Sequence, residues 1–274
     1  MLHDIELVCK VGSMALIDKE SEDINYNIIS RLSKSLKPGY VLVSSGATEI
    51  GRLDYIKRHG HELKGDSESI KTDYAAGGQA VLMETYRRYM QPNYSLRQFL
   101  VEHQHFNNSK KREHLKEALI RSVKQSAVPI INYNDPLCNE ESRKMEINAL
   151  KLKQQDVAEC IDNDETASQI ACLLKPKYLI ILTATDGILT DKNDSNTLVK
   201  EISGKTTDEV IEKINYYQGF CHGANRVGAN GAKAKLEFIK EPVKQGTTVF
   251  IANSKHKLDD ILNGNAPSTM IKLR

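Results

Sequence analysis

The sequence predicts an α/β protein built on a mainly parallel sheet that is sandwiched by helices. Six apolar runs have the length and residue types of buried strands, and five segments with helical periodicity lie between them. Strands and helices alternate with short connections, which is the order typical of a parallel sheet covered on both faces. The 274 residues are enough for one large domain or two closely associated lobes.

Each expected element can be placed along the chain. The six strands are expected at Ile5–Val11, Tyr40–Val43, Leu96–Val101, Val128–Ile131, Tyr178–Leu182 and Thr247–Ile251. The five helices are expected at Glu22–Leu36, Ser69–Tyr89, Lys110–Gln125, Glu165–Leu174 and Ala229–Ile239. In such sheets ligands bind at the carboxyl ends of the strands, so the residues after each run are the first candidates for a site.

Small and polar residues follow several of these runs. They are Gly12-Ser13 (with Lys10 just before), Ser44-Ser45-Gly46-Ala47, Asn132 to Pro136, Thr183 to Gly187, and Gly228 to Gly231 ahead of Lys233 and Lys235. Small residues let backbone N–H groups approach an anion, and helix N-termini attract it. Lysines near two separate loops of this kind could neutralise phosphate charge. Neither a P-loop nor a G-x-G-x-x-G fingerprint is present, so a phosphate site here uses another scaffold.

The segment Asp162-Asn163-Asp164 directly precedes an apolar helical run, Ala167–Leu174. One aspartate there can cap free backbone N–H groups at the helix start, where negative charge is favoured. A second interpretation places a polar substrate and a charged cosubstrate at this strand-to-helix junction. Local sequence does not choose between these two interpretations. Lys10 lies in an apolar run, where an unpaired lysine is costly to bury, and this favours a functional role for Lys10 if the strand is central.

Composition excludes several classes of function. Charge is nearly balanced, with 38 Lys and Arg against 36 Asp and Glu, so we expect neither nucleic acid nor membrane as a partner. No apolar run approaches the length of a membrane span, and the first residues lack a signal-peptide pattern. Five cysteines without close ligand spacing are typical of reduced thiols in a cytoplasmic protein. His103 and His105 have no evident third ligand, so we expect no protein metal site.

Seven segments, taken in order, resemble the amino acid kinase family, and within it most closely the glutamate 5-kinases. Val8–Ser13 resembles V-x-K-x-G-[ST], Val43–Ala47 V-[ST]-S-G-A, Ala75–Gln79 A-x-V-G-Q, Pro129–Asp135 P-[IV]-[IV]-N-E-N-D, Asp162–Asp164 G-D-N-D, Leu182–Gly187 L-T-D-x-D-G, and Gly228–Lys235 G-T-G-G-M-x-T-K. The match runs along nearly the whole chain, and seven ordered motifs are far more specific than any one.

The resemblance implies ATP-dependent phosphorylation of the side-chain carboxylate of L-glutamate, giving γ-glutamyl phosphate in the first step of proline biosynthesis. It implies the amino acid kinase (carbamate kinase-like) fold as one domain over 1–274, in a short form without an appended RNA-modification-type domain. An N-terminal lobe, about 1–170, would bind the amino acid, and a C-terminal lobe, about 171–274, the nucleotide. Mg²⁺ would arrive with the ATP, and the chain would form a homo-oligomer, a dimer or tetramer.

Roles follow residue by residue from the same resemblance. Lys10, Asp164 and Lys235 would be catalytic, with the lysines around the transferring phosphoryl group and Asp164 orienting them. The acceptor would contact Ser45, Gly46, Asp135, Asp162 and Asn163. The nucleotide would contact Lys10, Gly12, Thr183, Ala184, Gly228, Ala229, Asn230, Gly231 and Lys235. Without the motifs, Lys235 reads as a solvated helix face and Asp135-Pro136 as an ordinary turn pair.

Departures from the family pattern cluster at these motifs. Where the family pattern has glutamate, glycine, aspartate and tyrosine, this chain has Tyr133, Ile161, Ala184 and Leu189, respectively. The 228–235 loop lacks a glycine and a threonine of the pattern. Asp135 and Asp162 are also further apart than the family's short connection, through an added charged segment at 138–159. Asn139 with Glu140-Glu141 can start a helix there. The segment is a lid, an oligomer contact or an inert surface excursion.

Two alternatives stay open. One is a kinase of the same fold acting on another small carboxylate or on a phosphate-bearing acceptor, as in a uridylate kinase, although Ser44-Ser45-Gly46-Ala47 departs from the glycine-only loop expected there. The other is a catalytically weakened regulatory or binding homologue. The altered positions 184 and 229–234 favour it, whereas the retained Lys10, Asp164 and Lys235 oppose it.

Overall fold

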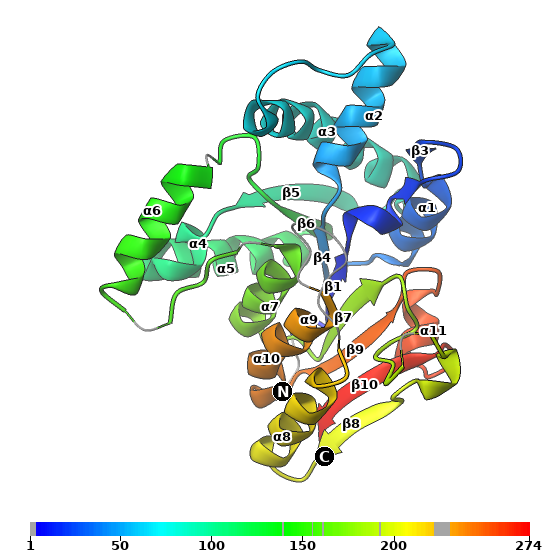
Figure 1. The fold of residues 1–274 in the computed structure, drawn as a ribbon, viewed down its shortest axis with the longest axis vertical. Coiled ribbons are helices and arrows are strands. Elements are labelled where there is room, and N and C mark those ends of the chain that lie inside the picture. The colour runs from blue at the N-terminus through cyan, green and yellow to red at the C-terminus, as the bar shows by residue number, and fades with distance from the viewer. Residues whose placement is uncertain (1–3, 139, 155, 161, 192, 222–230) are drawn as a thin grey trace. The chain divides into compact units, whose positions relative to one another are not determined.

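The computed structural model describes the whole chain except residues 1–3, 139, 155, 161, 192 and 222–230. Eight strands form one sheet in the order β5-β6-β4-β1-β7-β9-β10-β8 (Figure 1). The pairs β5/β6, β1/β7, β7/β9 and β8/β10 are parallel, and β9/β10 is antiparallel. The prediction of a mainly parallel sheet with helices is confirmed.

The bounds of the elements are as follows. The strands are β1 (Leu7–Val11), β2 (Ile17–Asp18), β3 (Asp23–Ile24), β4 (Tyr40–Ser44), β5 (Ser95–Val101), β6 (Ala127–Tyr133), β7 (Tyr178–Thr183), β8 (Glu201–Gly204), β9 (Thr248–Asn253) and β10 (Ser268–Leu273). The helices are α1 (Tyr26–Ser35), α2 (Ala47–His59), α3 (Ser67–Tyr89), α4 (Gln104–Asn107), α5 (Ser109–Lys124), α6 (Glu140–Lys151), α7 (Asn163–Leu174), α8 (Thr207–Gln218), α9 (Gly231–Phe238), α10 (Lys240–Lys244) and α11 (Leu258–Leu262), with short 3₁₀ helices η1 (Ser13–Ala15) and η2 (Ser195–Thr197).

The chain divides into two compact units. Unit 1 consists of Met1–Val11, Gly39–Val43 and Ile161–Arg274. Its strand β1 is buried at all five positions, including Lys10. The helix α7 is also largely buried and packs on β1. Because β1 pairs with β7 in register, Lys10 lies beside Ile181 in the apolar interior of this unit.

Unit 2 consists of Gly12–Pro38 and Ser44–Cys160. Its helices α2 and α3 cross at very short range, because two glycines lie at the crossing. A Cβ atom on Gly51 would lie 1.8 Å from the carbonyl oxygen of Tyr74, and one on Gly78 would lie 1.8 Å from that of Ala47. Any side chain at either position would force the two helices apart.

The six expected strands and five expected helices all occur, with shifted ends. The first helix begins later than expected, because Asn25 caps it at Ile28 N and residues Asp23–Ile24 instead pair with Ile17–Asp18. Strand β5 was expected to be buried, but it is the end strand of the sheet and only Val101 is buried within it. The helix expected from Glu140 in the added segment is present as α6.

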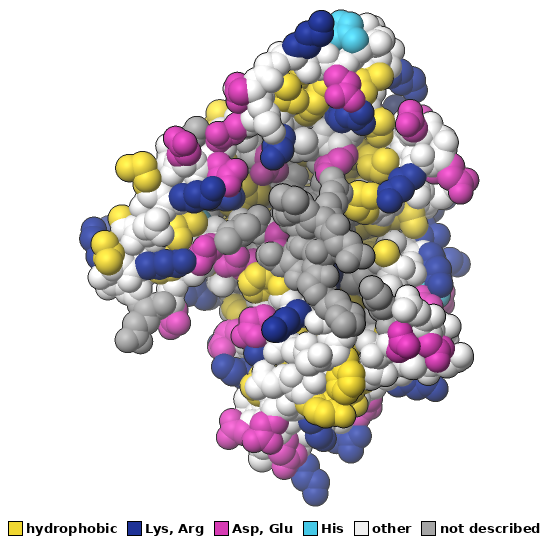
Figure 2. All heavy atoms as spheres, viewed as in Figure 1, with side chains coloured by type: hydrophobic (Ala, Val, Ile, Leu, Met, Phe, Trp, Pro, Cys, Tyr) yellow, Lys and Arg dark blue, Asp and Glu magenta, His cyan; other side chains and the backbone are white. Residues whose placement is uncertain are grey.

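Charged side chains are distributed evenly over the described surface seen in Figure 2. There Lys and Arg side chains lie among Asp and Glu side chains, in keeping with 38 basic and 36 acidic residues in the sequence. Among the described helices, none has the length and apolar character required to cross a bilayer.

Candidate functional site

Two lysines converge on one buried carboxylate in unit 1. Lys10 Nζ lies 2.6 Å from Asp164 Oδ1, and Lys235 Nζ lies 2.6 Å from Asp164 Oδ2. Strand β1 supplies Lys10, the first turn of α7 supplies Asp164, and α9 supplies Lys235. The structure therefore brings together the three residues that the sequence predicted as catalytic.

Burial sets the electrostatics of this cluster. The side chains of Lys10 and Asp164 are 9% and 7% exposed, and that of Lys235 is 19% exposed. Burial by itself would raise the pKa of Asp164, but the attraction of Lys10 and Lys235 outweighs it, so the pKa lies below its ordinary value. The carboxylate is thus ionised at neutral pH, and the three groups together carry a net positive charge that can bind an anion.

The helix α9 is fixed to its neighbours within unit 1, which positions Lys235. Ser168 Oγ on α7 donates a hydrogen bond to the carbonyl oxygen of Phe238 at the end of α9. Gln218 Nε2 on α8 donates to the carbonyl oxygen of Lys233, 3.0 Å away. These bonds leave the Lys233 side chain exposed, whereas Lys235 points toward Asp164.

Asp162 caps the helix that carries Asp164. Its Oδ1 accepts hydrogen bonds from the backbone N–H groups of Asp164 (2.8 Å) and Glu165 (2.9 Å). The expected helix cap is confirmed, and it fixes the first turn of α7. Asn163 follows within that turn and is half-buried. The predicted contacts of Asp162 and Asn163 with an acceptor stay predictions.

The predicted nucleotide residues of unit 1 lie at the ends of strands and helices. Thr183 is the last residue of β7, and the Ala184 carbonyl that follows accepts a hydrogen bond from Asn253 Nδ2 at 2.7 Å. Gly231 begins α9 with a φ of 67°, a left-handed conformation that favours glycine. Gly228, Ala229 and Asn230, also predicted to contact nucleotide, lie outside the described residues.

The predicted residues Gly12, Ser45 and Gly46 lie in unit 2. Gly12 precedes the 3₁₀ helix η1, and Ser45-Gly46 joins β4 to α2. Gly46 has a φ of 101°, and a Cβ atom there would lie 3.1 Å from Leu16 Cδ1. Glycine is therefore favoured at position 46 both by the backbone conformation and by the space available.

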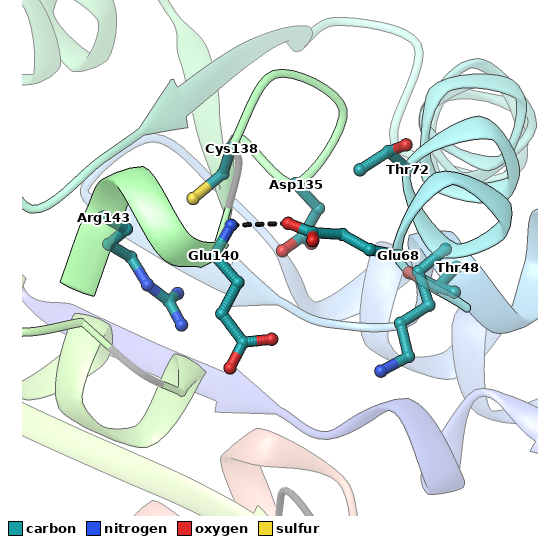
Figure 3. A pocket seen from close by; sticks show the side chains of 8 residues that line it. Thr48, Glu68, Thr72, Asp135, Cys138, Glu140 and Arg143 are labelled. Atoms are coloured by element: carbon teal, nitrogen blue, oxygen red, sulfur yellow. Dashed lines mark hydrogen bonds between the residues drawn. The ribbon is translucent and has the colours of Figure 1, made fainter. Parts of the chain in front are cut away.

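Asp135 lines a cavity of about 140 Å³ in unit 2 (Figure 3). The lining residues come from α2, α3, the turn after β6 and α6; they are Thr48, Glu68, Lys71, Thr72, Asp135, Cys138, Glu140 and Arg143. This volume lies below the roughly 300–1,000 Å³ typical of pockets for drug-sized ligands, so it suits a molecule of amino-acid size. Burial raises the pKa of Asp135 to about 6, Arg143 opposes that rise and Glu49 adds to it.

Sequence reasoning found Asp135 and missed the other residues of this cavity. Glu68, Lys71 and Thr72 lie in the first turns of α3, far from Asp135 in the sequence. Glu140 and Arg143 belong to the added segment, and their i, i+3 spacing on α6 was the available signal that both would face the same side. The structure places these two residues of the added segment at the cavity, and the role of the segment stays a prediction.

The fold and this lysine–carboxylate cluster define an α/β protein equipped to bind an anion beside a mainly parallel sheet, the architecture of a phosphotransferase. The chain belongs to the amino acid kinase family, whose profile matches residues 6–253. The sequence resemblance to that family is confirmed.

Two curated relatives are similar over most of the chain. The glutamate 5-kinase of Alkaliphilus metalliredigens is 28% identical over 280 residues, covering 97% of this chain and 95% of that protein. The glutamate 5-kinase of Streptococcus suis is 29% identical over 256 residues, covering 91% of this chain and 64% of that protein. The chain therefore spans less than two thirds of the second relative.

Solved structures share the fold. Carbamate kinase from Giardia lamblia bound to AMP-PNP has a TM-score of 0.60 at 17% identity, covering 98% of this chain and 99% of that one. Uridylate kinase from Archaeoglobus fulgidus has a TM-score of 0.52 at 13% identity, covering 97% and 100%. At these identities the likeness shows the carbamate kinase-like fold alone.

Proposed function

We propose that this chain transfers the γ-phosphoryl group of ATP to the side-chain carboxylate of L-glutamate. The single observation that carries the proposal is the cluster in which Lys10 and Lys235 each lie 2.6 Å from Asp164. Family membership and relatives named glutamate 5-kinase support the choice of acceptor. The product would be γ-glutamyl phosphate, the first intermediate of proline biosynthesis.

The chemistry requires positioning and charge neutralisation more than proton transfer. A carboxylate oxygen of the acceptor attacks the γ-phosphorus, an oxygen–phosphorus bond forms, and the bond to the oxygen bridging the β- and γ-phosphorus breaks to release ADP. The attacking carboxylate is already ionised at neutral pH, so no general base is needed. Negative charge on the transferring group is then balanced by fixed cations, which is the main catalytic contribution in this class.

The residues assigned to each task follow from this chemistry. Lys10 and Lys235 would bind the transferring phosphate, and Asp164 would hold both ammonium groups in place. Gly12, Thr183, Ala184 and the 228–231 segment would contact the rest of the nucleotide, and Ser45, Gly46, Asp135, Asp162 and Asn163 would contact the acceptor. Mg²⁺, bound to the nucleotide phosphates, would neutralise further charge. A cytoplasmic location and a homo-oligomer also stay predictions.

A trapping assay tests the reaction. The purified chain is incubated with MgATP, L-glutamate and hydroxylamine, which converts an acyl phosphate into a hydroxamate that is measured colorimetrically. We expect hydroxamate formation that requires both ATP and glutamate. ADP release with a phosphate-bearing acceptor, and no hydroxamate with glutamate, would instead identify a kinase for another substrate. Nucleotide binding without turnover on any acceptor would identify a regulatory homologue.

Two neighbouring lysines of α9 give a matched test of the site. Lys235→Ala removes a cation from Asp164 and should lower kcat by about 10²- to 10³-fold, the usual loss for one group that stabilises transition-state charge. Lys233→Ala removes the same charge from an exposed position of the same helix and should leave kcat within about 2-fold. Equal activity of the two variants would remove Lys235 from the mechanism.

A further inference from the structure

The added segment 138–159 is fixed to unit 2 at both of its ends. At its start, the Glu140 backbone N–H donates a hydrogen bond to Glu68 Oε1 on α3, 2.6 Å away (Figure 3). Near its end, Ala158 exchanges two hydrogen bonds with the side chain of Asn107, at 2.9 and 2.8 Å. Paired bonds from one amide side chain fix both the position and the direction of the backbone.

The helix α6, in the middle of the segment, also contacts the rest of unit 2. Glu146 Oε2 lies 3.1 Å from Nε2 of the buried His103, and Ile147 on the same helix is buried. Two polar anchors and one apolar anchor hold α6 in a defined orientation. As a result, the side of the helix that carries Glu140 and Arg143 is held at the cavity of Asp135.

Arg143 interacts with the hydroxyl group of Tyr133 but has no paired carboxylate among the described residues. Its side chain is half-buried, and its Nε atom is buried without a hydrogen-bond partner among the described residues. No described carboxylate lies within salt-bridge distance of its guanidinium group, whose central carbon lies 5.5 Å from the centre of the Tyr133 ring. A guanidinium group is costly to bury without an anion, and its planar donors match a carboxylate.

The opposite sign of charge is present in the same cavity. Glu68, Asp135 and Glu140 line it together with Arg143 and Lys71. Figure 3 shows the Arg143 guanidinium group on one side of the space and the carboxylates of Asp135 and Glu68 across from it. A cavity of about 140 Å³ that presents both a guanidinium group and carboxylates can bind a small zwitterion, that is, the carboxylate and ammonium groups of a free amino acid.

We propose that Arg143 binds the α-carboxylate of the acceptor, and that the added segment thereby restricts the acceptor to free α-amino acids. The inference rests on the proposed function only for the assignment of this cavity to the acceptor. The α-carboxylate is the group that Arg143 binds, because the side-chain carboxylate must stay available as the nucleophile.

Binding measured without ATP tests this proposal. Isothermal titration calorimetry compares two pairs of ligands that differ only in the α-carboxylate: L-glutamate with 4-aminobutyrate, and L-aspartate with β-alanine. In the wild-type chain, the α-carboxylate should increase affinity by at least about 10-fold in one pair, as expected for a hydrogen-bonded charge pair. In Arg143→Met this ratio should fall to about 2-fold or less, and Arg143→Lys should retain part of it.

Arg112→Met is the matched control, because it removes the same side chain from an exposed position of α5 in the same unit. It should keep the wild-type ratio, and thermal melts should confirm that all variants are folded. A wild-type ratio near 1 in both pairs, or an unchanged ratio in Arg143→Met, would overturn the assignment.

The outcomes separate the two proposals. If Arg143-dependent binding of an α-amino acid persists while the hydroxamate assay is negative, the inference stands and the proposed reaction fails. If hydroxamate forms with the same KM for glutamate in Arg143→Met as in the wild type, the reaction stands and the role of Arg143 is excluded.

Discussion

Replacing Gly78 by alanine should destabilise the protein, whereas the same change at the adjacent Gly77 should stabilise it. Both residues lie in α3. A Cβ atom on Gly78 would lie 1.8 Å from the Ala47 carbonyl oxygen, whereas one on Gly77 meets nothing within 4 Å. Since real Cβ contacts are not shorter than 3.0 Å, α2 and α3 would have to separate locally by about 3.0 − 1.8 = 1.2 Å.

The magnitudes follow from two opposing effects. Alanine is favoured over glycine in a helix by about 0.8–1 kcal/mol, and this applies to both positions. Overpacking costs about 1–3 kcal/mol, and the upper end is appropriate here because the obstacle is backbone that cannot adopt another rotamer. We therefore expect Gly78→Ala to lower the free energy of unfolding by about 2 kcal/mol and Gly77→Ala to raise it by about 0.5–1 kcal/mol.

Urea unfolding followed by circular dichroism measures both variants against the wild type. The structure requires midpoints in the order Gly77→Ala, wild type, Gly78→Ala. Gly51→Ala, whose Cβ atom would lie 1.8 Å from the Tyr74 carbonyl oxygen, should behave like Gly78→Ala. If Gly78→Ala unfolds at the same urea concentration as Gly77→Ala or higher, the close crossing of α2 and α3 is wrong.

Two further predictions concern the charged groups. Asp164→Asn leaves Lys10 and Lys235 without their shared anion, so it should lower the free energy of unfolding by about 3–5 kcal/mol. In urea unfolding experiments, added phosphate should restore part of this loss. A variant as stable as the wild type would contradict the ion cluster. Because the pKa of Asp135 is raised from 3.8 to about 6, its contribution to stability is fully present below about pH 4 and is lost as the pH rises through 6. Between pH 4 and 7, the free energy of unfolding of the wild type should therefore fall by up to about 3 kcal/mol relative to that of Asp135→Asn. If the free energies of unfolding of the two proteins change in parallel with pH, the Asp135 carboxyl group is not buried as described.

The sequence was sufficient for the core of the sheet and for the lysine cluster. Apolar runs such as Tyr178–Leu182 are buried strands because they pair on both sides, and length and composition reveal this locally. Lys235 could be selected over Lys233 only through the motif, because residues two apart on a helix point in different directions and neither is apolar. The structure places Lys235 at Asp164 and leaves Lys233 exposed.

Other parts could not be predicted because their partners are distant in sequence. The strands β8 and β10 are short and mix polar with apolar residues, so they become strands only by pairing with each other and with β9. The helix α6 was expected from Glu140 and Glu141, but its orientation depends on Glu68, which lies 72 residues earlier. Arg143 therefore could not be assigned to the cavity from local pattern alone.

The path of the chain through the two units sets the order in which they can form during synthesis. All of unit 2 has been made by Cys160, whereas unit 1 needs Ile161–Arg274 in addition to its early strands. Lys10 precedes its counter-ion Asp164 by 154 residues, which is roughly 8–30 s of translation at about 5–20 residues per second. Throughout that interval β1 is an apolar strand whose partner β7 has not yet been synthesised. The nascent chain therefore exposes an unpaired strand edge to which chaperones can bind.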